Sequence, residues 1–247
     1  MILAFIGTAG SGKTTLTAEF GKYLEENGYL VSYINLDTGV RKLPYKPDID
    51  VRKDVTAWGL MGKGLGPNGA IVKSYDILAP RVREYAGEIR ALDGESDYVL
   101  IDTPGQMETF LFHEFGVELM EAFPDALGVY LFSPEILRKP ADFCFALFFG
   151  LMIDLRLGIT TVPALSKVDT VDDVSRLRKF LDDVEYLTAR LKLEPSTQGL
   201  LAYKLCSSLP ELAPPTRVLY LSAKTGEGFD ELETIAYEHY CTCGDLT

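Results

Sequence analysis

Short apolar runs rich in β-branched residues alternate along the chain with longer segments of helical periodicity. Most of these runs are continuously apolar instead of alternating, so they predict strands that helices cover on both faces. The pattern predicts strands at residues 2–6, 30–36, 98–101, 127–132, 161–165 and 218–221. It predicts helices at residues 14–26, 80–92, 107–123, 140–157, 171–191 and 229–240. Strand–helix–strand repetition favours a three-layer α/β fold with a mainly parallel sheet and right-handed crossovers.

One long connection interrupts this rhythm. About 60 residues separate the second predicted strand from the third, and residues 38–68 contain several Gly and Pro but no long periodic segment. Long irregular connections inside a compact domain are usually functional or disordered. We therefore interpret residues 1–247 as a single domain with an insert at about residues 38–97.

The predicted helix at 140–157 is apolar around most of its circumference. A helix of this kind is expected to be buried on all sides, either in a core or across a dimer interface. Its longest apolar run, residues 143–153, is shorter than the roughly 20 residues that a bilayer span requires. The sequence therefore predicts no membrane association.

Acidic residues exceed basic ones, 36 against 24, which gives a formal net charge of −12. Binding to bare nucleic acid needs clustered Lys and Arg, and no basic stretch here is longer than two residues. We therefore expect no direct nucleic-acid partner. The N-terminal apolar run is too short for a secretory signal, and the chain has only four cysteines, so we expect a cytoplasmic protein.

A phosphate-binding motif lies between the first predicted strand and the first predicted helix. Gly7-Thr8-Ala9-Gly10-Ser11-Gly12-Lys13-Thr14 matches the P-loop pattern G-x-x-x-x-G-K-[ST] in the required context. Small residues let backbone N–H groups surround the phosphates, and the helix N-terminus adds partial positive charge. Lys13 is expected to reach the β- and γ-phosphates, and the Thr14 hydroxyl to coordinate Mg²⁺. The predicted phosphate-binding residues are Gly10, Ser11, Gly12, Lys13, Thr14 and Thr15.

A second motif, Asp102-Thr103-Pro104-Gly105-Gln106, ends the predicted strand at 98–101. A carboxylate at the tip of a strand beside the P-loop can hold Mg²⁺, so Asp102 is a predicted metal ligand. Gly105 is free to turn its amide toward a γ-phosphate. Gln106 is expected to orient the attacking water. The alternative is an ordinary turn with a capping aspartate.

Two further motifs predict which base is bound. Ser166-Lys167-Val168-Asp169 is similar to the N-K-x-D motif of GTPases, with Ser in place of Asn, and Ser222-Ala223-Lys224 is similar to their S-A-K loop. The Asp169 carboxylate can accept hydrogen bonds from guanine N1–H and N2–H₂, which adenine lacks. The Lys167 stem can lie across the base. The alternative for this pair is a surface ion pair before a helix.

Together these motifs resemble those of P-loop GTPases of the signal-recognition and MinD-related class. Gly66-Pro67-Asn68 in the insert makes the likeness specific, because the chain then resembles the GPN-loop GTPases over almost its whole length. The likeness also includes Asn35-Leu36-Asp37. It departs from the family at Asp37-Thr38-Gly39, where the family usually has D-P-A. The absence of long tails makes the chain similar to archaeal members.

The resemblance implies a homodimer that uses GTP/GDP and Mg²⁺. It implies that the Asn68 loop of each subunit acts in trans at its partner's γ-phosphate, and that Asp37 lies near the attacking water and Mg²⁺. The implied catalytic residues are therefore Lys13, Asp37, Asn68 and Gln106, and the implied metal ligands are Thr14, Asp37 and Asp102. Eukaryotic members are linked to the assembly and nuclear import of RNA polymerase II, which implies a protein client.

Three functions are compatible with the P-loop. The preferred one is hydrolysis of GTP to GDP and phosphate by a molecular switch or assembly factor. The alternative is a small-molecule or nucleoside kinase, whose acceptor-binding region the long insert could supply. The motifs at 102–106 and 166–169 oppose it, because they sense phosphate and base and do not bind an acceptor. A scaffold that binds GTP without turnover is the third possibility.

Overall fold

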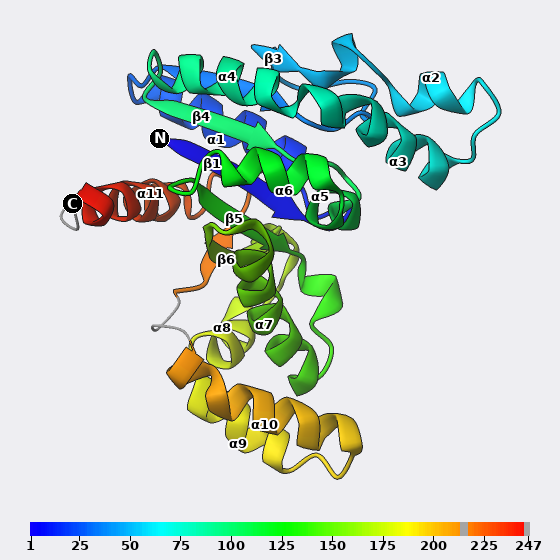
Figure 1. The fold of residues 1–247 in the computed structure, drawn as a ribbon. Helices are drawn as coiled ribbons and strands as arrows, with labels where there is room; N and C mark the ends of the chain where they lie inside the picture. The colour runs from blue at the N-terminus through cyan, green and yellow to red at the C-terminus, as the bar shows by residue number, and fades with distance from the viewer. Residues whose placement is uncertain (213–216, 245–247) are drawn as a thin grey trace.

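The computed structural model describes residues 1–212 and 217–244, except for the side chains of residues 242–244. Its centre is a seven-stranded, entirely parallel sheet in the order β3-β2-β4-β1-β5-β6-β7 (Figure 1). The strands are β1 (Ile2–Gly7), β2 (Val31–Asn35), β3 (Ile49–Asp50), β4 (Tyr98–Asp102), β5 (Leu127–Phe132), β6 (Thr160–Ser166) and β7 (Leu219–Leu221). The six predicted strands are confirmed, and the two-residue strand β3 is additional.

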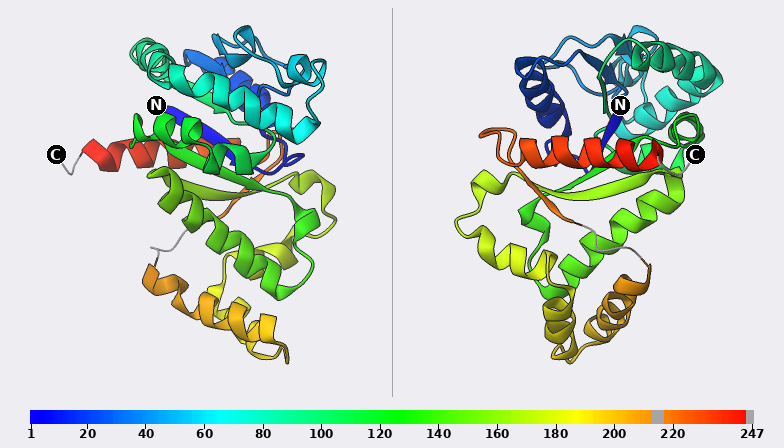
Figure 2. Two further views of the ribbon diagram at one scale, coloured as in Figure 1. Left: turned by 45° about the vertical axis from the view of Figure 1, so that its right-hand side comes forward. Right: turned by 90° about the vertical axis from the view of Figure 1, so that its left-hand side faces the viewer.

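Helices cover both faces of the sheet, which confirms the three-layer α/β prediction. One face carries α1 (Lys13–Glu26) and α11 (Phe229–Gly244), whose Phe20 and Phe229 share a buried cluster with Phe5 of β1. In the right-hand view of Figure 2, α11 lies in front of the strands. The other face carries α4 (Val82–Asp93), α5 (Met107–Phe112), α6 (Glu114–Glu121) and α7 (Pro140–Leu157). Burial on both faces explains why the strands are continuously apolar.

The strand order places the chemistry at one edge of the sheet. β1 is central and pairs in parallel with β4 on one side and β5 on the other. The loops that follow parallel strands all emerge at the carboxyl edge, and ligands bind in the crevice where the strand order reverses. The P-loop after β1 therefore lies at the same edge of the sheet as the segments that follow β2, β4, β6 and β7.

The insert is more regular than the sequence pattern predicts. Residues 38–68, expected to be irregular, contain β3, a 3₁₀ turn at Val51–Lys53 and α2 (Ala57–Met61). α3 (Pro67–Leu78) begins within the GPN motif, with Pro67 at its first position, where the missing N–H costs nothing. A second 3₁₀ turn, Ala79–Arg81, leads into α4. α2 and α3 lie side by side (Figure 1).

Two helix predictions need correction, and one further helix is additional. The predicted helix at 107–123 is two helices, α5 and α6, separated at His113, which has extended backbone angles and whose Nδ1 accepts a hydrogen bond from the Phe115 amide. The predicted helix at 171–191 is also two, α8 (Val174–Leu181) and α9 (Val184–Lys192), because the Asp183 side chain caps α9 by accepting from the Tyr186 amide. α10 (Thr197–Leu212) was not predicted. It packs on α7 and α9.

The apolar helix α7 has the predicted bounds but is not buried on all sides. Phe143 and Ile153 are buried, whereas Phe145, Met152 and Leu155 are 58 %, 57 % and 81 % exposed. The helix packs on the sheet and on α8–α10, and one strip of its surface is left uncovered. Within residues 1–212 and 217–244, no helix combines the length and the apolar character needed to cross a bilayer.

Candidate functional site

The P-loop has the geometry of a preformed anion cradle. Gly10 and Gly12 have φ of 79° and 97°, a region that glycine enters at no steric cost, so the chain can curl before α1. Lys13 Nζ donates to the carbonyl oxygens of Gly7 at 2.6 Å and Thr8 at 3.0 Å, and the side chain is 5 % exposed. Burial lowers the pKa of the Lys13 ammonium, while the Asp102 carboxylate acts in the opposite direction. The cation is thus held over the loop by the loop's own carbonyl groups.

Asp102 ends β4 directly beside the P-loop strand, as predicted. The residue is fully buried, and its Oδ2 accepts a hydrogen bond of 2.9 Å from the Tyr45 hydroxyl. Its Oδ1 has no hydrogen-bond partner among the described residues. Burial raises the pKa of the Asp102 carboxyl to about 6, and the nearby Asp37 carboxylate adds to the rise. A buried carboxylate oxygen without a partner is costly unless a ligand takes it.

These residues fit a Mg²⁺ ion. The candidate ligands are the Thr14 hydroxyl and the carboxylates of Asp37 and Asp102, and all of them offer oxygen. Mg²⁺ prefers oxygen ligands and is commonly held by one or two carboxylates together with substrate phosphates. The buried Oδ1 of Asp102, which has no hydrogen-bond partner among the described residues, can bind the cation or accept a hydrogen bond from one of its waters.

Asp37 connects the segment after β2 to the segment after β4. Its Oδ1 accepts from the Gly39 amide at 2.7 Å, and its Oδ2 accepts from the Gly105 amide at 2.9 Å. Gly105 is the residue whose amide was predicted to face a γ-phosphate. The structure therefore brings Asp37 and Gly105 together, and in this arrangement the carboxylate is the acceptor of that amide.

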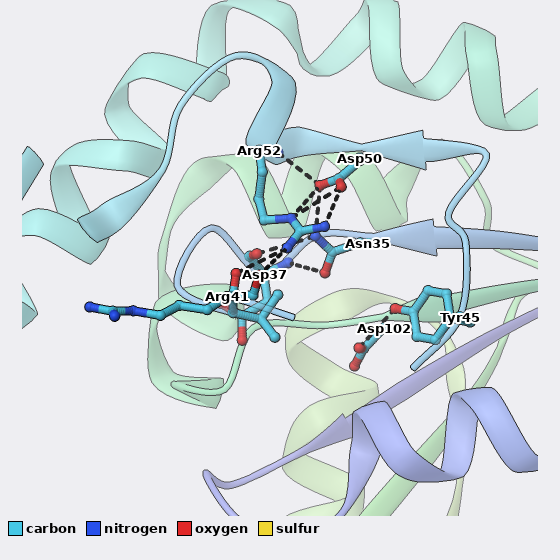
Figure 3. Close-up of polar contacts among 8 residues, drawn as sticks. Asn35, Asp37, Arg41, Tyr45, Asp50, Arg52 and Asp102 are labelled. Atoms are coloured by element: carbon cyan, nitrogen blue, oxygen red, sulfur yellow. Dashed lines mark hydrogen bonds and ion pairs between the residues drawn. The ribbon is translucent and has the colours of Figure 1, made fainter. Parts of the chain in front are cut away.

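The segment that follows Asp37 is held by a polar network (Figure 3). Arg52 donates through Nη2 to Asp50 at 2.6 Å and through Nη1 to the carbonyl oxygens of Val40 at 3.1 Å and Arg41 at 3.3 Å. Asn35, fully buried, donates to Asp50 at 2.8 Å, and its amide group also pairs with the main-chain N–H and C=O of Asp37. The path after Asp37, where the chain departs from D-P-A, is thereby fixed.

Asn68 and Gln106 meet within the same chain. Gln106 Nε2 donates to Asn68 Oδ1 at 3.0 Å. The two amides line a cavity of about 520 Å³ together with Thr8, Ala9, Gly105 and Glu108. The GPN loop thus adjoins both the P-loop and the segment after β4, on the side where a γ-phosphate would project.

α3 is tied to the end of β2 at two positions. The buried Tyr75 hydroxyl donates to the Leu36 carbonyl at 2.5 Å, and the buried Thr38 and Ser74 hydroxyls share a hydrogen bond of 2.7 Å. Leu36 and Thr38 flank Asp37. The helix whose first turn carries Asn68 is therefore anchored on either side of the predicted water-positioning carboxylate.

The loops that carry residues 166–169 and 222–224 converge on the start of α1. Ser222 Oγ donates to Asp169 Oδ1 at 2.7 Å, which joins the loops after β6 and β7. Lys167, with φ of 57°, is the sole non-glycine residue of positive φ in the part of the chain that the structure describes. Such backbone strain concentrates at functional sites. A pocket of about 270 Å³ is lined by Ser11, Gly12, Thr15, Leu16, Ser166, Lys167, Asp169, Thr170, Leu221, Ala223 and Lys224.

Ser166 behaves differently from an asparagine at that position. Its hydroxyl donates to the Phe132 carbonyl at 3.2 Å, a contact within the sheet and not with the P-loop. The side chain therefore ties β6 to β5, and Ser166 is one of the residues that line the pocket.

Sequence reasoning missed three residues that shape the site. Tyr45, Arg52 and Tyr75 lie in or beside the insert, where no periodicity or motif marked them. Their partners are remote in sequence, since Tyr45 bonds Asp102 and Tyr75 bonds Leu36. Only the fold reveals these contacts.

Fold and site together define a P-loop NTPase, with a P-loop, a carboxylate pair and a pocket beside the start of α1 at the carboxyl edge of a parallel sheet. Comparison with known proteins narrows the class. A family model described as "Conserved hypothetical ATP binding protein" matches residues 5–242. The chain is 66 % identical, over 100 % of both chains, to GPN-loop GTPase PAB0955 of Pyrococcus abyssi. The chain belongs to the GPN-loop GTPase family, as the motifs indicated.

A solved structure supports the same assignment. The crystal structure of PAB0955, described as a GTPase in apo form, matches with a TM-score of 0.95 and 65 % identity over 98 % of each chain. GPN-loop GTPase 1 of Dictyostelium discoideum is 31 % identical over 92 % of this chain. The alignment spans 58 % of that longer protein.

Proposed function

We propose that this chain is a Mg²⁺-dependent GTPase that hydrolyses GTP to GDP and phosphate. The observation that carries the proposal is the continuous pocket in which the P-loop end of α1 meets Asp169 and Ala223. A nucleotide whose phosphates lie on the P-loop would thus present its base to a carboxylate acceptor. The guanine-specific donors N1–H and N2–H₂ match that acceptor, whereas adenine has no donor at either position.

The residues of the site have different roles in hydrolysis. The Lys13 ammonium and the P-loop amides bind the β- and γ-phosphates and offset charge that develops on the equatorial oxygens. Bound Mg²⁺ would neutralise phosphate charge, held through Thr14, Asp37 and Asp102. Asp37 and Gln106 orient the attacking water, and Asn68 stands against Gln106 at 3.0 Å. Phosphoryl transfer depends chiefly on such positioning and electrostatic stabilisation.

Measuring phosphate release tests the proposal against its rivals. The protein is incubated with GTP or ATP and Mg²⁺, with and without nucleoside acceptors, and free phosphate and phosphorylated acceptor are quantified. We expect phosphate from GTP without any acceptor, and little from ATP or from the Lys13→Ala variant. Transfer that requires an acceptor would establish a kinase. Tight GTP binding with no release would establish a scaffold.

We further propose that the active form is a homodimer in which Asn68 acts in trans. Large apolar side chains are 40–49 % exposed on α2, α3 and their connection, next to the GPN loop: Trp58, Met61, Leu65, Val72 and Ile77. Exposed apolar clusters of this kind commonly mark interfaces. A side chain at Gly66 or Gly69 would meet no described atom within 4 Å, so packing inside this chain does not explain these glycines. A twofold interface would form two such sites together.

Mixing two inactive variants decides between action in trans and in cis. In a heterodimer of Asn68→Ala and Lys13→Ala subunits, one site combines an intact Lys13 with the partner's intact Asn68. We expect mixing under conditions of subunit exchange to restore part of the GTPase activity. The hydrogen bond between Asn68 and Gln106 of the same chain favours the alternative, in which Asn68 acts in cis. If Asn68 acts in cis, subunits that demonstrably exchange stay inactive.

We propose that the protein is cytoplasmic and acts as a molecular switch or assembly factor for a protein client. The family resemblance alone suggests that this client is related to RNA polymerase. The net charge of −12 favours a protein client over bare nucleic acid. Binding of purified archaeal RNA polymerase is compared in the presence of GDP and of a non-hydrolysable GTP analogue. Nucleotide-dependent binding supports the proposal. Equal or absent binding rejects this client and leaves the GTPase proposal intact.

A further inference from the structure

Tyr45 lies in the connection between β2 and β3, and its side chain reaches across to the metal side of the site. Its hydroxyl donates to Asp102 Oδ2 at 2.9 Å (Figure 3). Its ring stacks on the buried Tyr33, with ring centroids 5.1 Å apart and planes inclined by 21°.

This contact gives the two oxygens of Asp102 different tasks. Oδ2 is occupied by the tyrosine, whereas Oδ1 is buried and has no hydrogen-bond partner among the described residues. A carboxylate with one oxygen fixed cannot rotate without breaking that bond. The free oxygen therefore keeps one direction, and leaving it unfilled in a buried site is costly.

The placement of Tyr45 is built into the fold. Arg52 holds the carbonyl oxygens of Val40 and Arg41, a few residues before the tyrosine, and is itself paired with Asp50 of β3. On the other side, Asp48 follows Tyr45 closely, and its carboxylate accepts from the Tyr33 amide at 2.8 Å. Both ends of the segment that carries Tyr45 are thus attached to the sheet.

We propose that Tyr45 is a positioning residue for Mg²⁺, which fixes Asp102 so that Oδ1 is directed at the cation or its water shell. The proposal rests on the proposed function, because it assumes Mg²⁺-dependent nucleotide binding. Groups that orient a metal-binding carboxylate typically contribute 10- to 100-fold in metal affinity. Removal of the Tyr45 hydroxyl should therefore weaken Mg²⁺ binding without removing any direct contact to nucleotide or metal.

The test compares Tyr45→Phe with wild type and with Tyr33→Phe. Both variants keep the ring stack, but the Tyr33 hydroxyl bonds Glu25 and not Asp102, so Tyr33→Phe is a matched control. The release rate of a fluorescent GDP is measured while Mg²⁺ is titrated, and GDP affinity is measured separately in EDTA. For Tyr45→Phe we expect the Mg²⁺ midpoint to rise by about 10-fold. GDP affinity in EDTA should be unchanged, and Tyr33→Phe should match wild type.

Three outcomes would overturn the inference. A Mg²⁺ midpoint that is unchanged or lower in Tyr45→Phe shows that the hydroxyl does not support the cation. An equal loss of GDP affinity in EDTA and in Mg²⁺ shows that it only shapes the loop. If GDP release from wild type does not respond to Mg²⁺ at all, the metal in the proposed function fails and this inference with it. The first two outcomes refute Tyr45 alone.

Discussion

Asp169→Asn offers the most direct test of the guanine assignment. Ser222 Oγ donates to Asp169 Oδ1 at 2.7 Å, so that oxygen is fixed and Oδ2 remains available to the base. In the variant the amide oxygen would keep the Ser222 hydrogen bond, which turns the NH₂ group toward the base. The N1–H and N2–H₂ donors of guanine would then face the N–H donors of the new amide, and no hydrogen bond could form. Xanthine has an oxygen at position 2 and would accept from the new amide.

The size of the effect follows from the number of hydrogen bonds at stake. A hydrogen bond to a charged group contributes about 1.5–3 kcal/mol, and guanine offers two donors to the carboxylate. Two such bonds amount to about 3–6 kcal/mol, which corresponds to roughly 10²- to 10⁴-fold in affinity. Wild type should prefer GDP over ADP by a factor in this range. The variant should lose most of that preference and gain affinity for xanthosine diphosphate.

Competition against a fluorescent GDP measures all three affinities on one sample. GDP, ADP and xanthosine diphosphate are titrated against wild type, Asp169→Asn and the control Asp172→Asn. Asp172 is exposed, stands three residues away and does not line the pocket, so its variant changes the charge equally without touching the base. The guanine assignment is wrong if ADP displaces fluorescent GDP from wild type as well as GDP does. It is equally wrong if Asp169→Asn still prefers GDP over ADP as strongly as wild type does.

Three further predictions concern the phosphate end. Lys13→Ala removes the buried ammonium over the P-loop and should weaken GTP binding by about 100-fold, as measured by equilibrium titration. Asp102→Ala should raise the Mg²⁺ concentration needed for tight GDP binding, and full nucleotide affinity in EDTA would contradict its metal role. At saturating Mg²⁺, Asp37→Ala or Gln106→Ala should lower kcat by about 100-fold with little change in nucleotide affinity. A large loss of GTP affinity with normal turnover would show that these roles are reversed.

The sheet and the phosphate site were predictable because their signals are local. Each strand is a continuous apolar run, and the P-loop, the segment after β4 and the base motifs each occupy a few consecutive residues at a strand end. Parallel strands bring such ends to one edge, so convergence of Lys13, Asp102 and Asp169 follows from topology. In the structure β1 and β4 pair in parallel, and Asp169 lines one pocket with Gly12 of the P-loop.

The insert was not predictable in the same way. α3 begins at Pro67 within Gly66-Pro67-Asn68-Gly69, a sequence that also suits a surface turn, and tertiary contacts of Tyr75 and Ser74 decide that it is helical. The break at His113 has no Gly or Pro to announce it. It is held by the His113 ring, which caps α6, and by Arg156, which binds the Leu111 carbonyl at 2.7 Å. Interactions between remote segments carry no signature in a local pattern.

The anchoring of α3 sets the rotational phase of the GPN loop. Asn68 and Tyr75 are seven residues apart, which is close to two full helical turns, so both lie on the same face of α3. The Tyr75 hydroxyl donates a hydrogen bond to the Leu36 carbonyl, and Asn68 accepts one from Gln106 on that face. One residue inserted or deleted between them would turn Asn68 by about 100° away from the site. An insertion of a complete turn would keep its direction but displace it along the axis by about 5 Å. The length of this helix is therefore as constrained as the identity of the asparagine it presents.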